Sequence, residues 1–214
     1  MRLPFDPDAW MFVIPLGIAA LVMWLLGWCT PGWVALLLML FSLYFFRDPE
    51  RIIPEQPSAV VAPADGKVVK IDTAYQSQEF PQGAICVSIF LSVFNVHVQR
   101  APFAGTVFSK SYHPGKFMAA WDHRASEENE RSLMVMETAH GKIGVKQIAG
   151  LVARRVVLRA RVGQRLERGD HIGLIRFGSR VDLIVPPEFE ITIKVGDTVT
   201  GGETVMARAW KNAA

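Results

Sequence analysis

A glycine and a serine interrupt a stretch of sequence that otherwise has the composition of a β-strand. The stretch is IRFGSRVDLIVPP, residues 175–187, and both Gly178 and Ser179 are poor strand formers. A β-bulge or a close approach between two backbones would explain the pair structurally. A serine hydroxyl is also a nucleophile wherever a neighbouring group can take its proton. The pair therefore has a structural and a catalytic interpretation.

Two further residues could supply acid–base chemistry. Asp65 precedes a glycine in PADGK, and because Asp-Gly is a strong turn signal, a purely local role is the alternative. His97 alternates with Asn95 and Gln99, so it is either a base or a residue of the polar face of a strand.

Three residues are weaker candidates. His113, in YHPGKF, is a second possible acid or base, with turn packing beside Pro114 as the alternative. Arg100 and Lys116 could together hold a phosphodiester or a carboxylate, because paired cationic donors suit both groups. Taken singly, each cation is better explained by solvation at the surface.

Several common kinds of site are missing from the sequence. It contains no HExxH, CxxC or EF-hand spacing, so no metal is expected. It has no G-x-S-x-G elbow and no glycine-rich phosphate loop, and a Ser-His or Ser-Lys hydrolase would not need a glycine directly before its serine. The formal charge of +3 and the lack of interleaved aromatic and basic residues do not favour nucleic acid as a partner.

Residues 1–50 are predicted to form a membrane anchor. The first apolar run, 10–28, would be about 28 Å long as a helix, close to the hydrocarbon thickness of a bilayer. Cys-Thr-Pro-Gly at 29–32 is expected to break it, and the second run, 33–46, reaches about 21 Å. Together they predict a helical hairpin. A secretory signal peptide is the alternative, but its apolar core would be too long and no cleavage site follows.

Charge and cysteine content predict where the protein is located. Arg2 precedes the hairpin and Arg47 and Arg51 follow it, which favours both termini on the cytoplasmic side of the cell (inner) membrane. Cys29 lies in the apolar segment and Cys86 in a predicted buried strand, so the sequence suggests no disulfide framework and fits a reducing compartment.

Residues 51–214 are predicted to form a mainly β domain, because short apolar or alternating stretches are separated by glycines and prolines. The charged segment FMAAWDHRASEENERS is the best candidate for a helix or long loop. RVGQRLERGDHIG, from Arg161, and KVGDTVTGGETVM, from Lys194, form a weak repeat. Such paired hairpins resemble those of biotinyl/lipoyl-like β-sandwich domains. A non-enzymatic, membrane-anchored adaptor or carrier is therefore an alternative function, although neither hairpin tip has the lysine that a carrier needs.

Seven stretches in a fixed order carry a resemblance to a known family. They look like the short, membrane-anchored bacterial and archaeal form of phosphatidylserine decarboxylase, and they cover nearly the whole chain. The stretches are FFRDPER (45–51), APADGKV (62–68), FNVHVQRAP (94–102), YHPGKF (112–117), ASEENER (125–131), VKQIAGLVARR (145–155) and IRFGSRVDLIVP (175–186).

The resemblance implies a proenzyme that cuts itself between Gly178 and Ser179, giving residues 1–178 (the β chain) and 179–214 (the α chain), which stay together as a heterodimer. The Ser179 hydroxyl attacks the Gly178 carbonyl, and elimination from the resulting ester leaves dehydroalanine, which hydrolyses to a covalent pyruvoyl group with loss of ammonia. A glycine suits this route because it has no Cβ and lets the hydroxyl approach, in a strained turn.

The implied activity is that of a carboxy-lyase. The pyruvoyl group forms a Schiff base with the substrate amine and serves as an electron sink, so phosphatidylserine yields phosphatidylethanolamine and carbon dioxide without an external cofactor. The implied partners are this phospholipid and the membrane that contains it.

The resemblance also assigns roles to an aspartate and a histidine. Asp65 matches the aspartate, and His97 matches the first histidine of an H-x-x-H stretch. Arg100 stands where the second histidine would be, so this strand supplies only one of the two. His97 could act on Ser179 during maturation or later protonate the substrate carbon, and both roles stay open.

Overall fold

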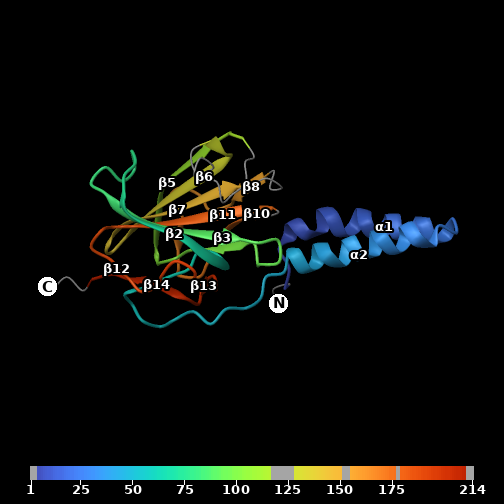
Figure 1. The fold of residues 1–214 in the computed structure, drawn as a ribbon, viewed down its shortest axis with the longest axis horizontal. Helices are drawn as coiled ribbons and strands as arrows, with labels where there is room; N and C mark the ends of the chain where they lie inside the picture. The colour runs from blue at the N-terminus through green and yellow to red at the C-terminus, as the bar shows by residue number, and fades with distance from the viewer. Residues whose placement is uncertain (1–3, 117–127, 151–154, 177–178, 211–214) are drawn as a thin grey trace. The chain divides into compact units, whose positions relative to one another are not determined.

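The computed structural model describes residues 4–116, 128–150, 155–176 and 179–210. The chain forms two compact units, Met1–Glu50 and Arg51–Ala214. The first is helical, and the second consists almost entirely of strands (Figure 1). The predicted mainly β class is therefore confirmed, while the biotinyl/lipoyl-like assignment stays a prediction.

The first unit is a helical hairpin. A short 3-10 helix, η1 (Pro7–Ala9), leads into α1 (Trp10–Leu25), and α2 (Cys29–Phe45) follows after a turn at Gly27, whose φ of 78° favours glycine. The prediction that residues 29–32 would break the helices was wrong. These residues form the first turn of α2, where a proline is tolerated because its missing N–H has no partner within the helix.

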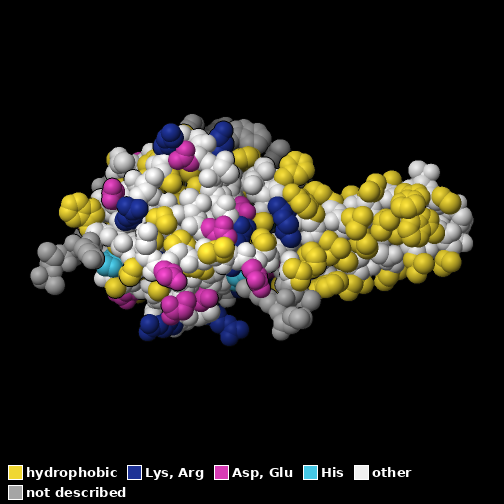
Figure 2. Space-filling model, turned by 90° about the horizontal axis from the view of Figure 1, so that it is seen from below, with side chains coloured by type: hydrophobic (Ala, Val, Ile, Leu, Met, Phe, Trp, Pro, Cys, Tyr) yellow, Lys and Arg dark blue, Asp and Glu magenta, His cyan; other side chains and the backbone are white. Residues whose placement is uncertain are grey.

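The outer surface of the hairpin is apolar. Trp24 of α1 and Trp33 of α2 pack edge to face, with ring centroids 5.4 Å apart. Most other large side chains of the two helices are exposed, and Figure 2 shows them as a nearly continuous hydrophobic surface. Pro7–Leu25 is long and apolar enough to cross a membrane. Helix α2 measures about 26 Å, longer than expected, because it begins four residues earlier.

The second unit is built from antiparallel ladders. Among the described residues, one eight-stranded sheet has the order β13-β2-β3-β11-β7-β6-β5-β9, and two three-stranded sheets have the orders β1-β14-β12 and β4-β10-β8. The segment expected to be a helix or loop falls largely at 117–127, outside the described residues. The strands are β1 (Ala59–Val61), β2 (Gly66–Tyr75), β3 (Ala84–Leu91), β4 (Val98–Arg100), β5 (Gly105–His113), β6 (Arg131–Thr138), β7 (Gly141–Ala149), β8 (Arg155–Leu158), β9 (Arg165–Leu166), β10 (His171–Arg176), β11 (Ser179–Val185), β12 (Glu190–Ile191), β13 (Thr198–Val199) and β14 (Val205–Arg208).

The β unit contains an internal duplication. The pattern Ala-Pro-x-x-Gly-x-Val occurs at 62–68, between β1 and β2, and again at 101–107, between β4 and β5. The copies bind each other reciprocally, since Val61 N donates to Pro102 O and Arg100 N to Pro63 O, both at 2.9 Å. The two copies therefore pack as structural equivalents.

The glycine of each copy allows a close crossing of two strands. A Cβ on Gly66 would lie 2.3 Å from Phe90 O, and one on Gly105 would lie 2.5 Å from Glu137 O, so neither position accepts a side chain. The repeat noted in the C-terminal part follows the same symmetry. It places β9 and β13 at opposite edges of the large sheet.

The run 175–187 is not one strand. β10 ends at Arg176 in a three-stranded sheet, and β11 begins at Ser179 in the middle of the eight-stranded sheet, between β3 and β7 (Figure 1). All seven residues of β11 are buried. The chain therefore passes from one sheet to another between Arg176 and Ser179. Residue 178, and with it the expected strained turn, lies outside the described residues.

Candidate active site

Ser179 is the first residue of the central strand and has no accessible surface. It pairs with Leu91 of β3 on one side and with Ala149 of β7 on the other. Its Oγ finds no hydrogen-bond partner among the described residues. An unpaired buried hydroxyl costs about 1–3 kcal/mol, so such a group calls for an explanation beyond packing. A nucleophile whose oxygen is not engaged elsewhere provides one.

The register of the sheet places Asp65 at the same end as Ser179. Lys67 of β2 and Arg180 of β11 both pair with Phe90 of the intervening β3. Because β2 and β11 run in the same direction, Gly66 lies level with Ser179, and Asp65 directly precedes Gly66 in the chain. Two strand spacings separate Gly66 from Ser179, so the backbones of these two residues are about 10 Å apart.

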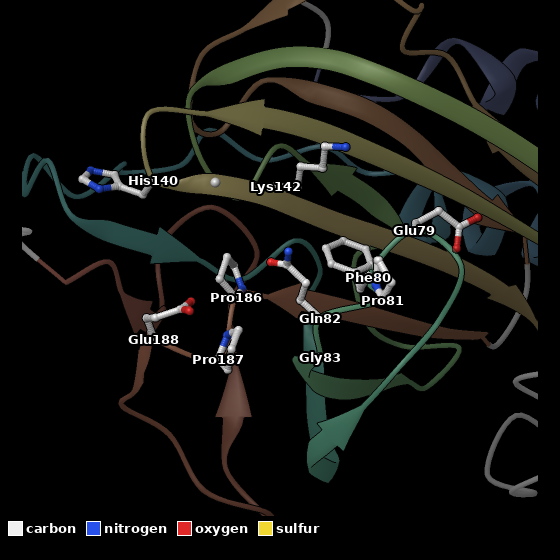
Figure 3. A pocket seen from close by; sticks show the side chains of 11 residues that line it. Glu79, Phe80, Pro81, Gln82, Gly83, His140, Lys142, Pro186, Pro187 and Glu188 are labelled. Atoms are coloured by element: carbon white, nitrogen blue, oxygen red, sulfur yellow. The ribbon is translucent and has the colours of Figure 1, made fainter.

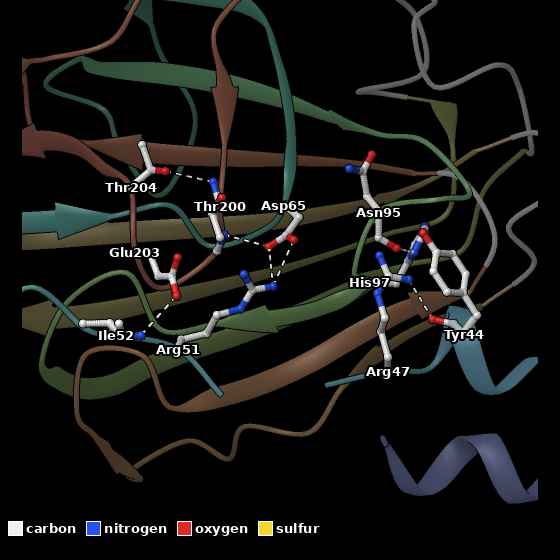
Figure 4. Close-up of polar contacts among 11 residues, drawn as sticks. Tyr44, Arg47, Arg51, Ile52, Asp65, Asn95, His97, Thr200, Glu203 and Thr204 are labelled. Carbon is white, nitrogen blue, oxygen red and sulfur yellow. Dashed lines mark hydrogen bonds and ion pairs between the residues drawn. The ribbon is translucent and has the colours of Figure 1, made fainter. Parts of the chain in front are cut away.

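Asp65 holds together three parts of the chain (Figure 4). Its carboxylate accepts two hydrogen bonds from Arg51 Nη2, at 3.0 and 2.9 Å, and one from Gly201 N at 2.8 Å. The equivalent residue of the other copy is Ala104, so the turn itself does not require an aspartate. The interpretation of Asp65 as a turn residue is therefore incomplete, because its carboxylate also binds residues that are far away in the sequence.

We expect Asp65→Asn to lower the free energy of unfolding by about 1–3 kcal/mol, because it leaves the guanidinium of Arg51 without its countercharge in a largely buried position. Asp72→Asn is the matched control. Asp72 and Lys70 form an exposed ion pair of similar length. Its loss should lower the free energy of unfolding by about 0.5 kcal/mol or less. Chemical denaturation of both variants in the same detergent measures the difference, and equal losses would contradict a structural role for the Asp65 pair.

His97 lies just before β4 and is 1% exposed. Its Nδ1 is 2.9 Å from the carbonyl oxygen of Asn95 (Figure 4). A carbonyl only accepts, so Nδ1 carries the proton and Nε2 is left as the basic nitrogen of the neutral ring. This is the form that a general base requires.

A short turn positions His97 relative to the serine. Asn95 Oδ1 accepts hydrogen bonds from both the backbone N and the Oγ of Ser92, each at 2.8 Å, which fixes the turn. The turn begins directly after Leu91, the residue that pairs with Ser179. The structure thus brings Ser179, Asp65 and His97 to the same end of the large sheet.

Arg100 is buried rather than solvated. Its Nη1 donates to Gly169 O at 3.2 Å, and its Cδ lies beside Gly202, the neighbour of the glycine that binds Asp65. Lys116, by contrast, is exposed and forms a 2.8 Å ion pair with Glu128. Of the two cations suggested for anion binding, only Arg100 is built into the interior near Asp65.

His113 lies away from the serine. It is exposed and pairs directly with Arg131 of β6. Arg131 pairs in turn with Ile148 of β7, and Ile148 pairs with Arg180 of β11. Opposed residues share one face of a sheet and successive residues alternate, so His113 is on the face opposite to Ser179. Three strand spacings, about 14 Å, add to this separation.

Sequence reasoning missed a buried charged cluster on that opposite face. Arg180 Nε donates to Asp182 Oδ1 and Arg180 Nη2 to Ser88 Oγ, both at 2.6 Å. Lys146 stands across from Asp182 on β7. Burial lowers the pKa of Lys146, and the nearby Asp182 partly opposes this shift. The only signal in the sequence was a pair of opposite charges inside an apolar strand.

A hollow of about 430 Å³ lies at the other end of β11 (Figure 3). Pro186 and Pro187, which follow β11, line it together with Phe80, His140 and Lys142. Seven strand residues, or about 23 Å, separate Pro186 from Ser179. This hollow is therefore not part of the candidate site. The described residues also contain no group of three or more metal-ligating side chains.

Comparison with known proteins identifies the family. The sequence model of phosphatidylserine decarboxylase matches residues 38–207. The phosphatidylserine decarboxylase proenzyme of Pelobacter propionicus is 52% identical over 80% of this chain and 78% of its own length. The proenzyme of Geotalea uraniireducens is 43% identical over 95% of both chains, and that of Magnetococcus marinus is 48% identical over 90% of this chain and 83% of its own. These relatives give no support to an adaptor or carrier. The chain belongs to the phosphatidylserine decarboxylase family.

Proposed function

We propose that this chain is a proenzyme that cuts itself between Gly178 and Ser179 and then converts phosphatidylserine into phosphatidylethanolamine and carbon dioxide. The observation that carries the proposal is Ser179 itself. A fully buried serine begins the central strand, and its hydroxyl has no partner among the described residues. Family membership supplies the reaction, and this serine supplies the group that must be transformed.

His97 is the base best placed to serve maturation. Its Nε2 would take the Ser179 hydroxyl proton as the oxygen attacks the Gly178 carbonyl, which forms an ester and frees the amine of residue 179. Asp65 is less suited to the same task, because its carboxylate already accepts hydrogen bonds from Arg51 and Gly201. We assign it the positioning of the surrounding segments.

The surroundings of Ser179 fit its conversion into a pyruvoyl group. Such a group supplies a ketone that takes up the electron pair left when carbon dioxide departs. Burial of residue 179 keeps bulk water away from this position, and its Oγ has no described contact that the conversion would break. Buried Arg100 is the better candidate for holding the anionic headgroup, with Lys116 second. His97 would return a proton to the substrate carbon, a role less suited to His113 on the opposite face.

The cut chain would stay together as a heterodimer. β11 pairs along its length with both β3 and β7, and β14 pairs with β1. The hydrogen bond from Gly201 to Asp65 also joins the two fragments. β11 and β14 are interior strands of sheets that contain strands of the large fragment, so the small fragment cannot leave without unfolding the unit.

The apolar hairpin would anchor the protein in the membrane that contains its substrate. Anchoring confines the search for a lipid to two dimensions. Arg47 and Arg51 follow the hairpin, which favours the cytoplasmic side of the cell (inner) membrane for the β unit.

Two measurements on the full-length protein in detergent test the proposal. Denaturing mass spectrometry should find fragments 1–178 and 179–214, the smaller without an N-terminal amine. Vesicles containing phosphatidylserine labelled in its serine carboxyl should release labelled carbon dioxide. An intact chain in a preparation that releases carbon dioxide would contradict self-cleavage, and a cleaved chain that releases none would contradict the substrate.

A further inference from the structure

A buried pair of glutamines bridges the two sheets that meet at the site. Gln147 of β7 lies in the large sheet, and Gln99 of β4 lies in a three-stranded sheet. Gln147 Nε2 donates to Gln99 Oε1 at 2.7 Å, and Gln99 Nε2 donates to the backbone oxygen of His97, also at 2.7 Å. Both glutamines are 0% exposed. The bridge therefore ends on the backbone of the proposed base.

The contacts of the bridge fix the orientation of both amides. The backbone oxygen of His97 can only accept, so Gln99 must present its NH2 group to it. Gln99 then presents its oxygen to Gln147, which must donate in turn. The Oε1 atom of Gln147 is left as a buried acceptor, and it finds no hydrogen-bond partner among the described residues.

Gln147 and Ser179 are neighbours on one face of the sheet. Ser179 stands across from Ala149, and Gln147 stands across from Val181. Ser179 and Val181 point to the same face, so Gln147 is the diagonal neighbour of Ser179 on the adjacent strand. Diagonal neighbours lie about 7–8 Å apart between backbones, within reach of a long side chain. A buried donor and a buried acceptor, neither with a partner among the described residues, thus extend from diagonal positions on one face of the sheet. The two atoms are not hydrogen-bonded to each other in the structure, so a contact between them requires a side-chain rotation.

We propose that Gln147 is a positioning residue for self-cleavage, which accepts the hydrogen bond of the Ser179 hydroxyl before the reaction. The inference rests on the proposed function. A hydroxyl whose hydrogen is held by Gln147 keeps its oxygen in one place and presents a lone pair to the neighbouring carbonyl. An amide oxygen is too weak a base to keep the proton, which passes to His97 when the bond to Gly178 forms.

Gln147→Met tests the inference directly. It keeps the length and burial of the side chain and removes the acceptor, so self-cleavage should slow about tenfold, the effect of losing one hydrogen bond. Gln99→Met is the matched control, because it breaks the same bridge and leaves Gln147 Oε1 in place. We expect similar melting temperatures for the two variants and clearly faster cleavage in Gln99→Met. The full chains are synthesised in a cell-free system with liposomes, and conversion of 1–214 into its fragments is followed by electrophoresis.

Gln147→Glu provides a second comparison. It keeps an oxygen acceptor for Ser179 at the same reach, and cleavage is measured at a pH high enough to ionise the new side chain, because a carboxylate cannot donate to Gln99 Oε1 and so leaves the bridge broken. A merely structural role therefore predicts cleavage as slow as in Gln147→Met or slower, and positioning predicts partial recovery. Equal cleavage rates in Gln147→Met and Gln99→Met would overturn the inference about Gln147 but not the proposed function. Failure of the unmodified chain to cleave would overturn the proposed function together with the inference.

Discussion

Replacing Ser179 with alanine should leave one uncleaved chain of 214 residues with no decarboxylase activity. The substitution removes both the nucleophile of self-cleavage and the precursor of the pyruvoyl group. The expected loss is the full catalytic effect, roughly 10⁶-fold or more. Folding should not suffer, because the hydroxyl has no partner among the described residues and its removal abolishes a buried polar atom.

Ser111→Ala is the matched control for this prediction. Ser111 lies in β5 of the same sheet, and its Oγ is likewise buried without a described partner. This variant should cleave and release carbon dioxide at the rates of the unmodified chain. Electrophoresis, circular dichroism and carbon dioxide release are measured on both. Labelled carbon dioxide from a folded, uncleaved Ser179→Ala protein would refute the assignment of this serine.

The structure explains why Gly178 and Ser179 stand out in the sequence and why the change of sheet next to them could not be predicted. Gly178 and Ser179 are visible in the sequence because they are the wrong residues for a strand. The same composition made 175–187 look continuous, since a strand entering another sheet keeps its apolar character. Only the pairing shows that β10 and β11 belong to different sheets. Sheet membership depends on partners far away in the sequence.

The helical hairpin, too, could be predicted only in part from the sequence. The absence of charge from Trp10 to Phe46 was sufficient to predict two apolar helices. Their boundary was misplaced because proline and glycine were taken as helix breakers at 29–32. Both residues are compatible with the first turn of a helix. The connection between the two helices depends instead on Gly27, which has a positive φ.

The duplication of Ala-Pro-x-x-Gly-x-Val could have been found in the sequence. Aligning 62–68 with 101–107 would have shown that Asp65 corresponds to Ala104, and therefore that the aspartate is specific to one copy. Its partner Arg51 could not have been identified, because the sequence contains 23 lysines and arginines. The bridge between Gln147 and Gln99 was equally hidden, since it joins two sheets.

His97→Gln should slow self-cleavage by about 10²–10⁴-fold, the usual contribution of a positioned general base. Glutamine retains an N–H donor for the Asn95 carbonyl and is uncharged, so the turn after β3 should be preserved. Its amide oxygen cannot hold the proton that leaves the Ser179 hydroxyl. The expected product is therefore a folded chain that matures slowly, and cell-free synthesis with timed electrophoresis measures the rate.

His140→Gln controls for the loss of an imidazole. His140 packs edge to face on Phe103, with ring centroids 5.7 Å apart, and it lines the hollow at the other end of β11. This variant should mature normally. Carbon dioxide release per pyruvoyl group in the slowly matured His97→Gln protein separates the two proposed roles of His97. If only cleavage is slow, His97 acts on the serine alone. If both rates fall, it also returns the proton to the substrate. Cleavage at the unmodified rate would mean that another group removes the hydroxyl proton, and the tautomer fixed by Asn95 would then have no role in maturation.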